Sequence, residues 1–144
     1  MTDEKKPLLA VRDLKVYYPI KVRSRGIFSQ KKLVRAVDGI SFDVYEGETL
    51  GIVGESGCGK STTGKTIVRL NRPTAGSVTY DGMDLFSCPP QAQARISREI
   101  QIVFQDPYSS LDPRFTVGRS IAEPLVVHKA GAPAERRARV VELM

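Results

Sequence analysis

A glycine-rich octet constrains this chain more than any other feature. Residues 54–61 read Gly-Glu-Ser-Gly-Cys-Gly-Lys-Ser, which satisfies the pattern G-x-x-x-x-G-K-[ST]. The five residues before it, 49–53, are apolar and β-branched enough for a buried parallel strand. Residues 61–70 contain no proline and lead into Asn71-Arg72-Pro73, a helix-stop signal. The sequence therefore predicts a strand, a glycine loop and a helix in succession.

This arrangement is suited to holding a phosphate. Glycines let consecutive backbone N–H groups turn toward an anion, and the N-terminus of the following helix adds a partial positive charge. Lys60 would reach the β- and γ-phosphates of a nucleotide, and the Ser61 hydroxyl would ligate Mg²⁺. The predicted nucleotide-binding residues are Gly54, Glu55, Ser56, Gly57, Cys58, Gly59, Lys60, Ser61 and Thr62. A glycine turn with a chance Lys-Ser is disfavoured, because a strand and a helix flank it.

Composition limits the other possibilities. The 144 residues suffice for one domain with a core, and no apolar run approaches the roughly 20 residues of a membrane-spanning helix. The N-terminus has no apolar core after its charges, so it does not resemble a secretory signal. Cys58 and Cys88 lack the spacing of a disulfide framework or a metal site. These features favour a cytoplasmic protein.

The net charge of +6 is unevenly distributed. Between Pro19 and Val37 there is no acidic residue and there are six basic ones, namely Lys21, Arg23, Arg25, Lys31, Lys32 and Arg35. The segment is either a solvated basic loop or a contact with an anionic partner. Phe28 is the only aromatic residue there, so base stacking has little support and no nucleic-acid partner is expected. Anionic lipid or a membrane protein is preferred.

The order of elements predicts an α/β nucleotide-binding core. Strands are expected at residues 8–18, 34–37, 40–44, 49–53, 77–80 and 100–104. Helices are expected at residues 61–70, 91–98, 117–129 and 134–144. Pro19 is expected to end the first strand and to begin an irregular basic insertion at 19–33, Asp38-Gly39 to form a turn, and Pro124 to interrupt its helix. The last helix has an apolar stripe and no stop signal, which predicts that the sequence was cut inside an element.

Four separated passages resemble one family. They are residues 14–20, 36–42, 54–62 and 103–114, the last reading Val-Phe-Gln-Asp-Pro-Tyr-Ser-Ser-Leu-Asp-Pro-Arg. The chain resembles the N-terminal part of the ATP-binding subunit of ABC transporters, in the oligopeptide and dipeptide importer group. The resemblance implies a P-loop NTPase fold with an N-terminal antiparallel β subdomain, truncated within the helical subdomain. It divides the chain into a tail (1–7), a nucleotide-binding core with the basic insertion (8–105), and a Q-loop with the start of the helical subdomain (106–144).

The resemblance also implies roles for single residues. Tyr18 matches the aromatic that stacks on adenine, with Tyr17 as the alternative. Gln105 matches the glutamine that contacts Mg²⁺ and the attacking water, and with Lys60 it completes the predicted catalytic pair. Ser61 and Gln105 would therefore share the metal. His128 lies too early to match the family's switch histidine and is expected to be structural or solvated.

The resemblance also indicates which catalytic motifs of the family this sequence lacks. The chain contains no L-S-G-G-Q signature, no apolar strand ending in Asp-Glu and no histidine after it. Because phosphoryl transfer depends on such positioning groups, these residues alone are expected to bind ATP·Mg²⁺ but to turn it over negligibly. The full-length family member would be an ATPase that powers peptide import from the cytoplasmic face of the inner membrane.

Partners follow from the resemblance as well. They would be membrane-spanning permease subunits that face the segment from Pro107 and the helices beyond it, a second, homologous ATP-binding subunit in a heterodimer, and an extracytoplasmic peptide-binding protein. Two other interpretations stay open. Another P-loop enzyme is one, although the N-K-x-D and D-x-x-G motifs of a GTPase do not occur after the loop. A non-hydrolysing nucleotide-binding fragment or adapter is the other.

Overall fold

The structure, a computed structural model, describes residues 6–23, 29–106 and 110–144, with side chains for all of these except 21–31. The chain forms two compact units, one extending to Ile102 and the other beginning at Val103. In chain order the elements are β1 (Leu9–Arg23), β2 (Ser29–Val44), α1 (Lys60–Ile67), β3 (Ala75–Tyr80), β4 (Met83–Asp84), α2 (Pro90–Glu99), α3 (Val117–Val127) and α4 (Pro133–Leu143). The first six belong to the first unit.

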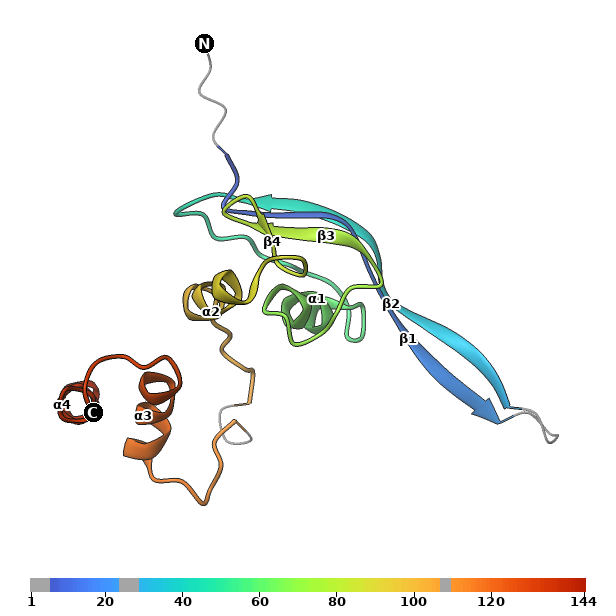
Figure 1. The fold of residues 1–144 in the computed structure, drawn as a ribbon. Helices are drawn as coiled ribbons and strands as arrows, with labels where there is room; N and C mark the ends of the chain where they lie inside the picture. Colours follow the sequence, from blue (N-terminus) through green and yellow to red (C-terminus); the bar gives the residue numbers. More distant parts are fainter. Residues whose placement is uncertain (1–5, 24–28, 107–109) are drawn as a thin grey trace, which may run out of the picture. The chain divides into compact units, whose positions relative to one another are not determined.

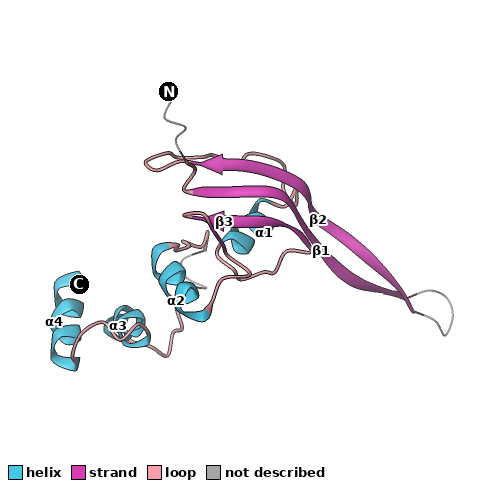
Figure 2. Cartoon of the chain, turned by 45° about the horizontal axis from the view of Figure 1, so that its top comes forward, coloured by secondary structure: helices cyan, strands magenta, loops and turns pink. Residues whose placement is uncertain are grey.

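The first unit is built on a four-stranded antiparallel sheet in the order β2-β1-β3-β4 (Figures 1 and 2). Helices α1 and α2 lie against one face of this sheet (Figure 1). Between sheet and helices is one apolar core, made of Val11, Leu14, Val16, Val37, Val78, Leu85, Cys88 and Ile96. The antiparallel N-terminal β subdomain implied by the sequence is therefore present.

Strands β1 and β2 continue well past the rest of the sheet. Their register runs from Leu9↔Val44 to Arg23↔Ser29, whereas β3 accompanies β1 only as far as Lys15↔Ala75. The expectation that Pro19 ends the first strand, and that residues 19–33 are irregular, is wrong for 19–23 and 29–33; residues 24–28 lie outside the described part. Pro19 is tolerated because β1 is paired on one side only at that point, so no ladder requires its missing N–H.

The three long strands are all irregular at one level of the sheet. Register shifts flank Arg12 and Asp13 in β1, where Asp13 has φ 44°. Opposite them, Gly39 in β2 and Gly76 in β3 both have φ 83°. The turn predicted at Asp38-Gly39 is therefore wrong, because β2 runs through it as a bulged strand. The bulge lets Val11, Leu14 and Val16 all face the core.

Two predicted strands are not formed. Residues 49–53 and 100–104 are extended or irregular, and no backbone ladder joins either of them to another described segment. Most of their apolar side chains are exposed, with Val53 94% and Val103 96% exposed, whereas Ile100 packs partly buried against the core. A strand exists only when a neighbour supplies its hydrogen bonds, and β-propensity alone does not provide one.

Helix α1 ends earlier than the predicted range of 61–70. Arg69 adopts φ 64°, and the Leu70 N–H donates to the Lys65 carbonyl at 2.8 Å. This left-handed residue closes the helix without a glycine. The helix predicted at 91–98 is confirmed as α2, with Pro90 at its first turn.

The second unit is a pair of packed helices. The Thr116 side chain caps α3 by accepting from the Arg119 N–H at 3.2 Å, and Pro124 lies inside α3, so the predicted interruption at this proline is wrong. Val140 of α4 is buried and faces Gly118 of α3, whereas Val141 beside it is exposed. Within the described residues, no helix has the length and apolar content needed to cross a membrane.

Candidate functional site

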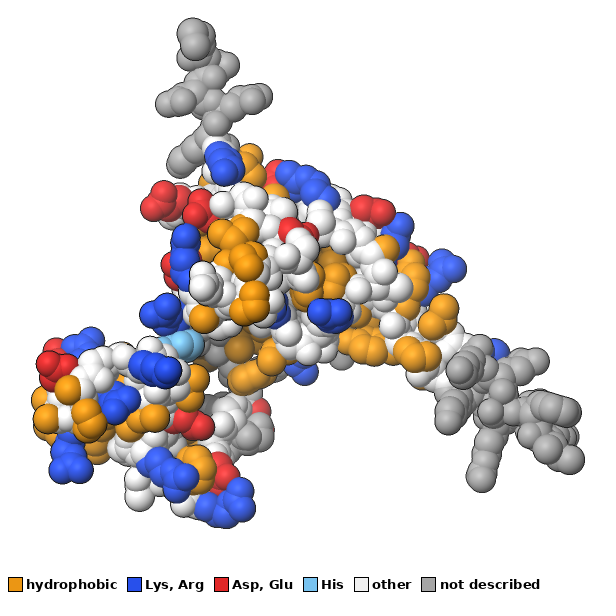
Figure 3. Space-filling model, in the orientation of Figure 1, with side chains coloured by type: hydrophobic (Ala, Val, Ile, Leu, Met, Phe, Trp, Pro, Cys, Tyr) orange, Lys and Arg blue, Asp and Glu red, His pale blue; other side chains and the backbone are white. Residues whose placement is uncertain are grey.

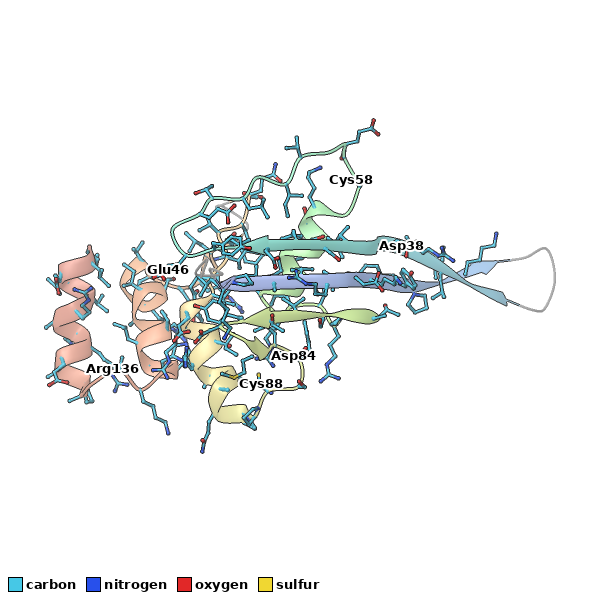
Figure 4. All side chains as sticks on the ribbon, turned by 90° about the horizontal axis from the view of Figure 1, so that it is seen from above. Asp38, Glu46, Cys58, Asp84, Cys88 and Arg136 are labelled. Atoms are coloured by element: carbon cyan, nitrogen blue, oxygen red, sulfur yellow. The ribbon has the colours of Figure 1, made fainter. Side chains whose placement is uncertain are left out.

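The glycine loop is held in shape by its own backbone. Gly57 and Gly59 have φ 82° and 100°, and the Cys58 N–H donates to the Glu55 carbonyl at 3.4 Å. Such left-handed positions favour glycine and turn neighbouring N–H groups toward a common side. Figure 4 shows Cys58 on this loop, where the chain enters α1. The loop predicted from the sequence therefore has glycines at the two left-handed positions that a phosphate-binding turn would use.

Gly59 fixes the loop to the sheet. It is the N-cap of α1, and a Cβ atom placed on it would lie 2.2 Å from the Ala36 carbonyl oxygen and 3.3 Å from Val37 Cγ2. The end of the loop therefore touches the backbone of β2. The sequence pattern requires a glycine here, but it does not reveal this contact, because Ala36 is 23 residues earlier in the chain.

The first turn of α1 is free of negative charge. It contains no acidic residue, and no side chain caps it. Helix N–H groups in the first turn have no partner within the helix, so they and the helix dipole attract an anion. Ser61 and Thr62 lie in this turn, and Ser61 is exposed. The hydroxyl of Ser61 is therefore accessible beside the loop.

Lys60 folds back over the loop. Its Nζ donates to the carbonyls of Gly54 at 2.7 Å and Glu55 at 2.6 Å, and lies 3.6 Å from Cys58 Sγ. The ammonium group thus lies within the curve of the loop, where it adds a full positive charge to the partial charges of the N–H groups. The structure brings the Lys60 ammonium group together with Gly54, Glu55 and Cys58 of the loop.

Tyr17 and Tyr18 are on opposite faces of β1. Tyr18 follows the core-facing Leu14 and Val16 at alternate positions, is paired with Val34 and is 40% exposed. Its ring is therefore on the face that carries α1 and is accessible to a ligand. Tyr17 is engaged on the other face, where its hydroxyl donates to Asp38 and Arg35 lies 5.7 Å from its ring centroid. This geometry favours Tyr18 over Tyr17 as the stacking residue.

Tyr17 offers a test of that outer face. The hydrogen bond to Asp38, together with desolvation, raises the pKa of Tyr17, and Arg35 opposes the shift. Because the pKa is raised in the folded chain, this stabilisation is complete below the ordinary tyrosine pKa and is lost as the pH rises through the folded value. Asp38→Ala should therefore lower the pKa of Tyr17 in an NMR titration of labelled tyrosine rings, with Tyr17→Phe assigning the signal. Glu46→Ala, at an exposed site, should leave it unchanged; an unaltered Tyr17 titration in Asp38→Ala would contradict the contact.

Gln105 belongs to the second unit. It lies between the exposed Phe104 and Asp106, and its own side chain is exposed.

An ion pair joins two residues of the passage that follows Gln105: Asp112 accepts from Arg114 Nη2 at 2.7 Å and Nε at 3.0 Å. The hydrogen bond from the Arg114 side chain lowers the pKa of Asp112.

His128 is the C-cap of α3 and is half-buried, as expected for a structural residue. Residues 107–109 lie outside the described part.

The residues present fit a nucleotide with a metal ion. Gly54 and Gly59 have no room for a side chain, and Gly57 and Gly59 adopt φ values that disfavour one. Lys60 supplies a positive charge. Ser61 of the first unit carries an alcohol oxygen and Gln105 of the second unit an amide oxygen, and each is a hard ligand of the type that Mg²⁺ accepts. Among the described residues no group of three or more His, Cys, Asp or Glu side chains could hold a metal alone. A cation here would therefore need ligands from the phosphates themselves.

A phosphate loop that leads into a helix beside an antiparallel β subdomain defines a nucleotide-binding domain. Residues 37–144 match the ABC transporter family, and the chain belongs to that family. It is 46% identical over 138 residues to the dipeptide transport ATP-binding protein DppF of Escherichia coli K12, covering 96% of this chain and 40% of that protein. It is 43% identical over 145 residues to the oligopeptide transport ATP-binding protein OppF of the same organism, covering all of this chain and 43% of that protein.

Solved structures agree with this assignment. The dimeric ATP-binding cassette MJ0796, in a post-hydrolysis state bound to ADP and Pi, is similar with a TM-score of 0.69 and 27% identity. That likeness covers 93% of this chain and 54% of MJ0796. The fold class expected from the sequence is confirmed. The chain spans about two fifths of the length of the two transport proteins that it matches.

Proposed function

We propose that this chain is the nucleotide-binding part of an ATP-binding subunit that powers peptide import through an ABC transporter. The observation that carries the proposal is the loop at residues 54–61, which is anchored on β2 by Gly59 and covered by the ammonium group of Lys60. The similarity to dipeptide and oligopeptide transport proteins supports the substrate class. The cofactors would be ATP and Mg²⁺.

Each proposed site residue has a physical task. The loop from Gly54 to Thr62 would bind the phosphates through N–H groups, and Lys60 would neutralise charge on the β- and γ-phosphates. Tyr18, exposed on the face of the sheet that carries α1, would stack on adenine. Ser61 and Gln105 would hold Mg²⁺, which supplies charge neutralisation when bound. Lys60 and Gln105 would be the residues that contact the reacting phosphate and water.

Turnover would require groups that the 144 residues do not contain. A strand-end glutamate, a signature loop and a switch histidine are missing from the sequence. We therefore propose that the chain alone binds ATP·Mg²⁺ and hydrolyses it negligibly. In the assembled transporter, at the cytoplasmic face of the inner membrane, the partners would be permease subunits, a second ATP-binding subunit and an extracytoplasmic peptide-binding protein.

Replacement of Lys60 tests the nucleotide site. Loss of a charge-assisted contact to phosphate is worth about 1.5–3 kcal/mol, so Lys60→Ala should weaken ATP binding by about 10- to 100-fold. Titration calorimetry in the presence of Mg²⁺ would measure the change. Lys65→Ala is the matched control, because Lys65 is an exposed lysine in the last turn of the same helix.

Several results would count against the proposal. Equal ATP affinity in Lys60→Ala and the unaltered chain would remove the loop as the binding site. Displacement of bound ATP by GTP with higher affinity would indicate another class of P-loop enzyme. Steady ATP hydrolysis that Lys60→Ala abolishes would refute the expectation of negligible turnover. Capture of a partner without any ATP binding would instead favour an adapter.

A further inference from the structure

The part of the β1–β2 hairpin that extends beyond the sheet has no role in the nucleotide site proposed above, apart from Tyr18 at its base. We define the arm as residues 18–23 and 29–34, whose register runs from Tyr18↔Val34 to Arg23↔Ser29. β3 stops alongside Lys15, so the described part of the arm has no third strand on either side. Six residues of strand extend about 20 Å. The arm can therefore reach a surface that the body of the domain does not touch (Figure 1).

Apolar side chains are exposed on both faces of the arm. Ile20 shares a face with Tyr18 and Val34, and Ile20 and Val34 are 42% and 44% exposed. Leu33 pairs with Pro19 on the other face and is 65% exposed. Figure 3 shows hydrophobic surface continuing up to the region drawn in grey. A flat protein partner would cover the apolar side chains on only one face of this hairpin, whereas a medium that surrounds the hairpin would cover those on both faces.

The charge of the same segment is of one sign. The arm contains four basic residues, Lys21, Arg23, Lys31 and Lys32, and no acidic one. The strand register places Lys21 opposite Lys31 and Ile20 opposite Lys32. The basic positions therefore occur on both strands of the arm. Positive charge of one sign on both strands would attract an external anionic partner.

We propose that the arm docks on an anionic lipid surface, with Ile20, Leu33 and Val34 entering the headgroup layer and the lysines contacting lipid phosphates. Exposed branched side chains next to basic residues are the combination that binds the interface of a charged bilayer. A nucleic acid would favour aromatic side chains for stacking, and Tyr18 and Phe28 are the only aromatics from position 18 to 34. The arm would hold the nucleotide-binding domain close to the membrane independently of a permease.

Sedimentation with vesicles tests this without nucleotide. The 144-residue chain should bind vesicles of phosphatidylcholine mixed with phosphatidylglycerol, and should not bind phosphatidylcholine alone. Reversing two lysines of the arm, Lys21→Glu with Lys32→Glu, should lower partition by roughly 10-fold or more. The matched control, Arg72→Glu with Arg98→Glu, makes the same change in net charge outside the arm and should keep most of the binding. Ile20→Ser with Leu33→Ser should also weaken binding, although it alters no charge.

Several outcomes would overturn the proposal. They are no binding of the unaltered chain to anionic vesicles, equal loss in the arm and control variants, and full binding by the Ile20→Ser, Leu33→Ser chain. Displacement of the vesicles by a single-stranded oligonucleotide at lower concentration would assign the arm to nucleic acid instead. Far-ultraviolet circular dichroism of each variant shows whether the sheet is intact. If Lys21→Glu with Lys32→Glu unfolds the sheet, Lys21→Gln with Lys32→Gln replaces it and should give a smaller loss of the same sign.

Discussion

Gly59→Ala should abolish measurable ATP binding. The new Cβ would lie 2.2 Å from the Ala36 carbonyl oxygen, so either the loop or β2 must move, and φ 100° is unfavourable for alanine in any case. Backbone cannot swing aside as a flexible side chain can. The loop would therefore leave the position in which its N–H groups converge, and affinity measured by titration calorimetry should fall by at least about 100-fold, since each 1.4 kcal/mol is tenfold.

Gly57→Ala is the control that separates the contact from backbone strain. Gly57 has φ 82°, but a Cβ placed on it would meet nothing within 4 Å. It therefore carries the conformational cost of about 1–2 kcal/mol without the collision. We expect its ATP affinity to be clearly higher than that of Gly59→Ala. Equal affinities in the two variants would show that the contact with Ala36 does not hold the loop.

Gly76→Ala should have the largest effect on stability. A Cβ at Gly76 would lie 2.3 Å from the Asp13 carbonyl oxygen and 2.5 Å from that of Arg12, with φ 83°. Both neighbours are backbone of β1, at the level where all three long strands are irregular. The variant should lose about 3 kcal/mol or more of its free energy of unfolding, measured by urea denaturation, because β3 can no longer approach β1.

Gly47→Ala is the matched control for this effect. Gly47 lies on the turn after β2 with φ 77°, and a Cβ placed on it would meet nothing within 4 Å. Its loss should be limited to the strain of a left-handed alanine, about 1–2 kcal/mol. A loss in Gly76→Ala no greater than this would mean that the strands can separate at the bulge without cost.

Local signals in the sequence predicted the parts of the fold that depend on local chemistry. The helix expected at residues 91–98 is present as α2, and the glycine spacing marked the loop and α1. The bulge at Asp13 and Gly39 was not predicted, because it arises from three strands meeting. Asp and Gly occur both in tight turns and in β-bulges, so the Asp38-Gly39 pair does not distinguish a turn from a bulge.

The sequence likewise predicted the parts of the candidate site that depend on local chemistry. Lys60, Ser61 and the glycines follow from one pattern, and the structure places the glycines on the loop and Lys60 and Ser61 in the first turn of α1. The resemblance favoured Tyr18 and kept Tyr17 as the alternative. The structure adds that the two lie on opposite faces of β1, because adjacent residues of a strand differ in the face they occupy. The anchoring role of Ala36 was missed entirely, since it acts through its carbonyl oxygen and not its side chain.

Helix α1 has a consequence for the order of folding. It has only eight residues, and its buried residues are Thr63 and Thr66, whose hydroxyls donate to the carbonyls of Gly59 at 3.1 Å and Thr62 at 2.8 Å. Such a short segment, with β-branched residues that bond back to the preceding turn, is not helical on its own in water. It needs the sheet, whose β1–β3 pairing joins residues 60 or more positions apart. During refolding, the phosphate loop should therefore become ordered only after that long-range pairing has formed.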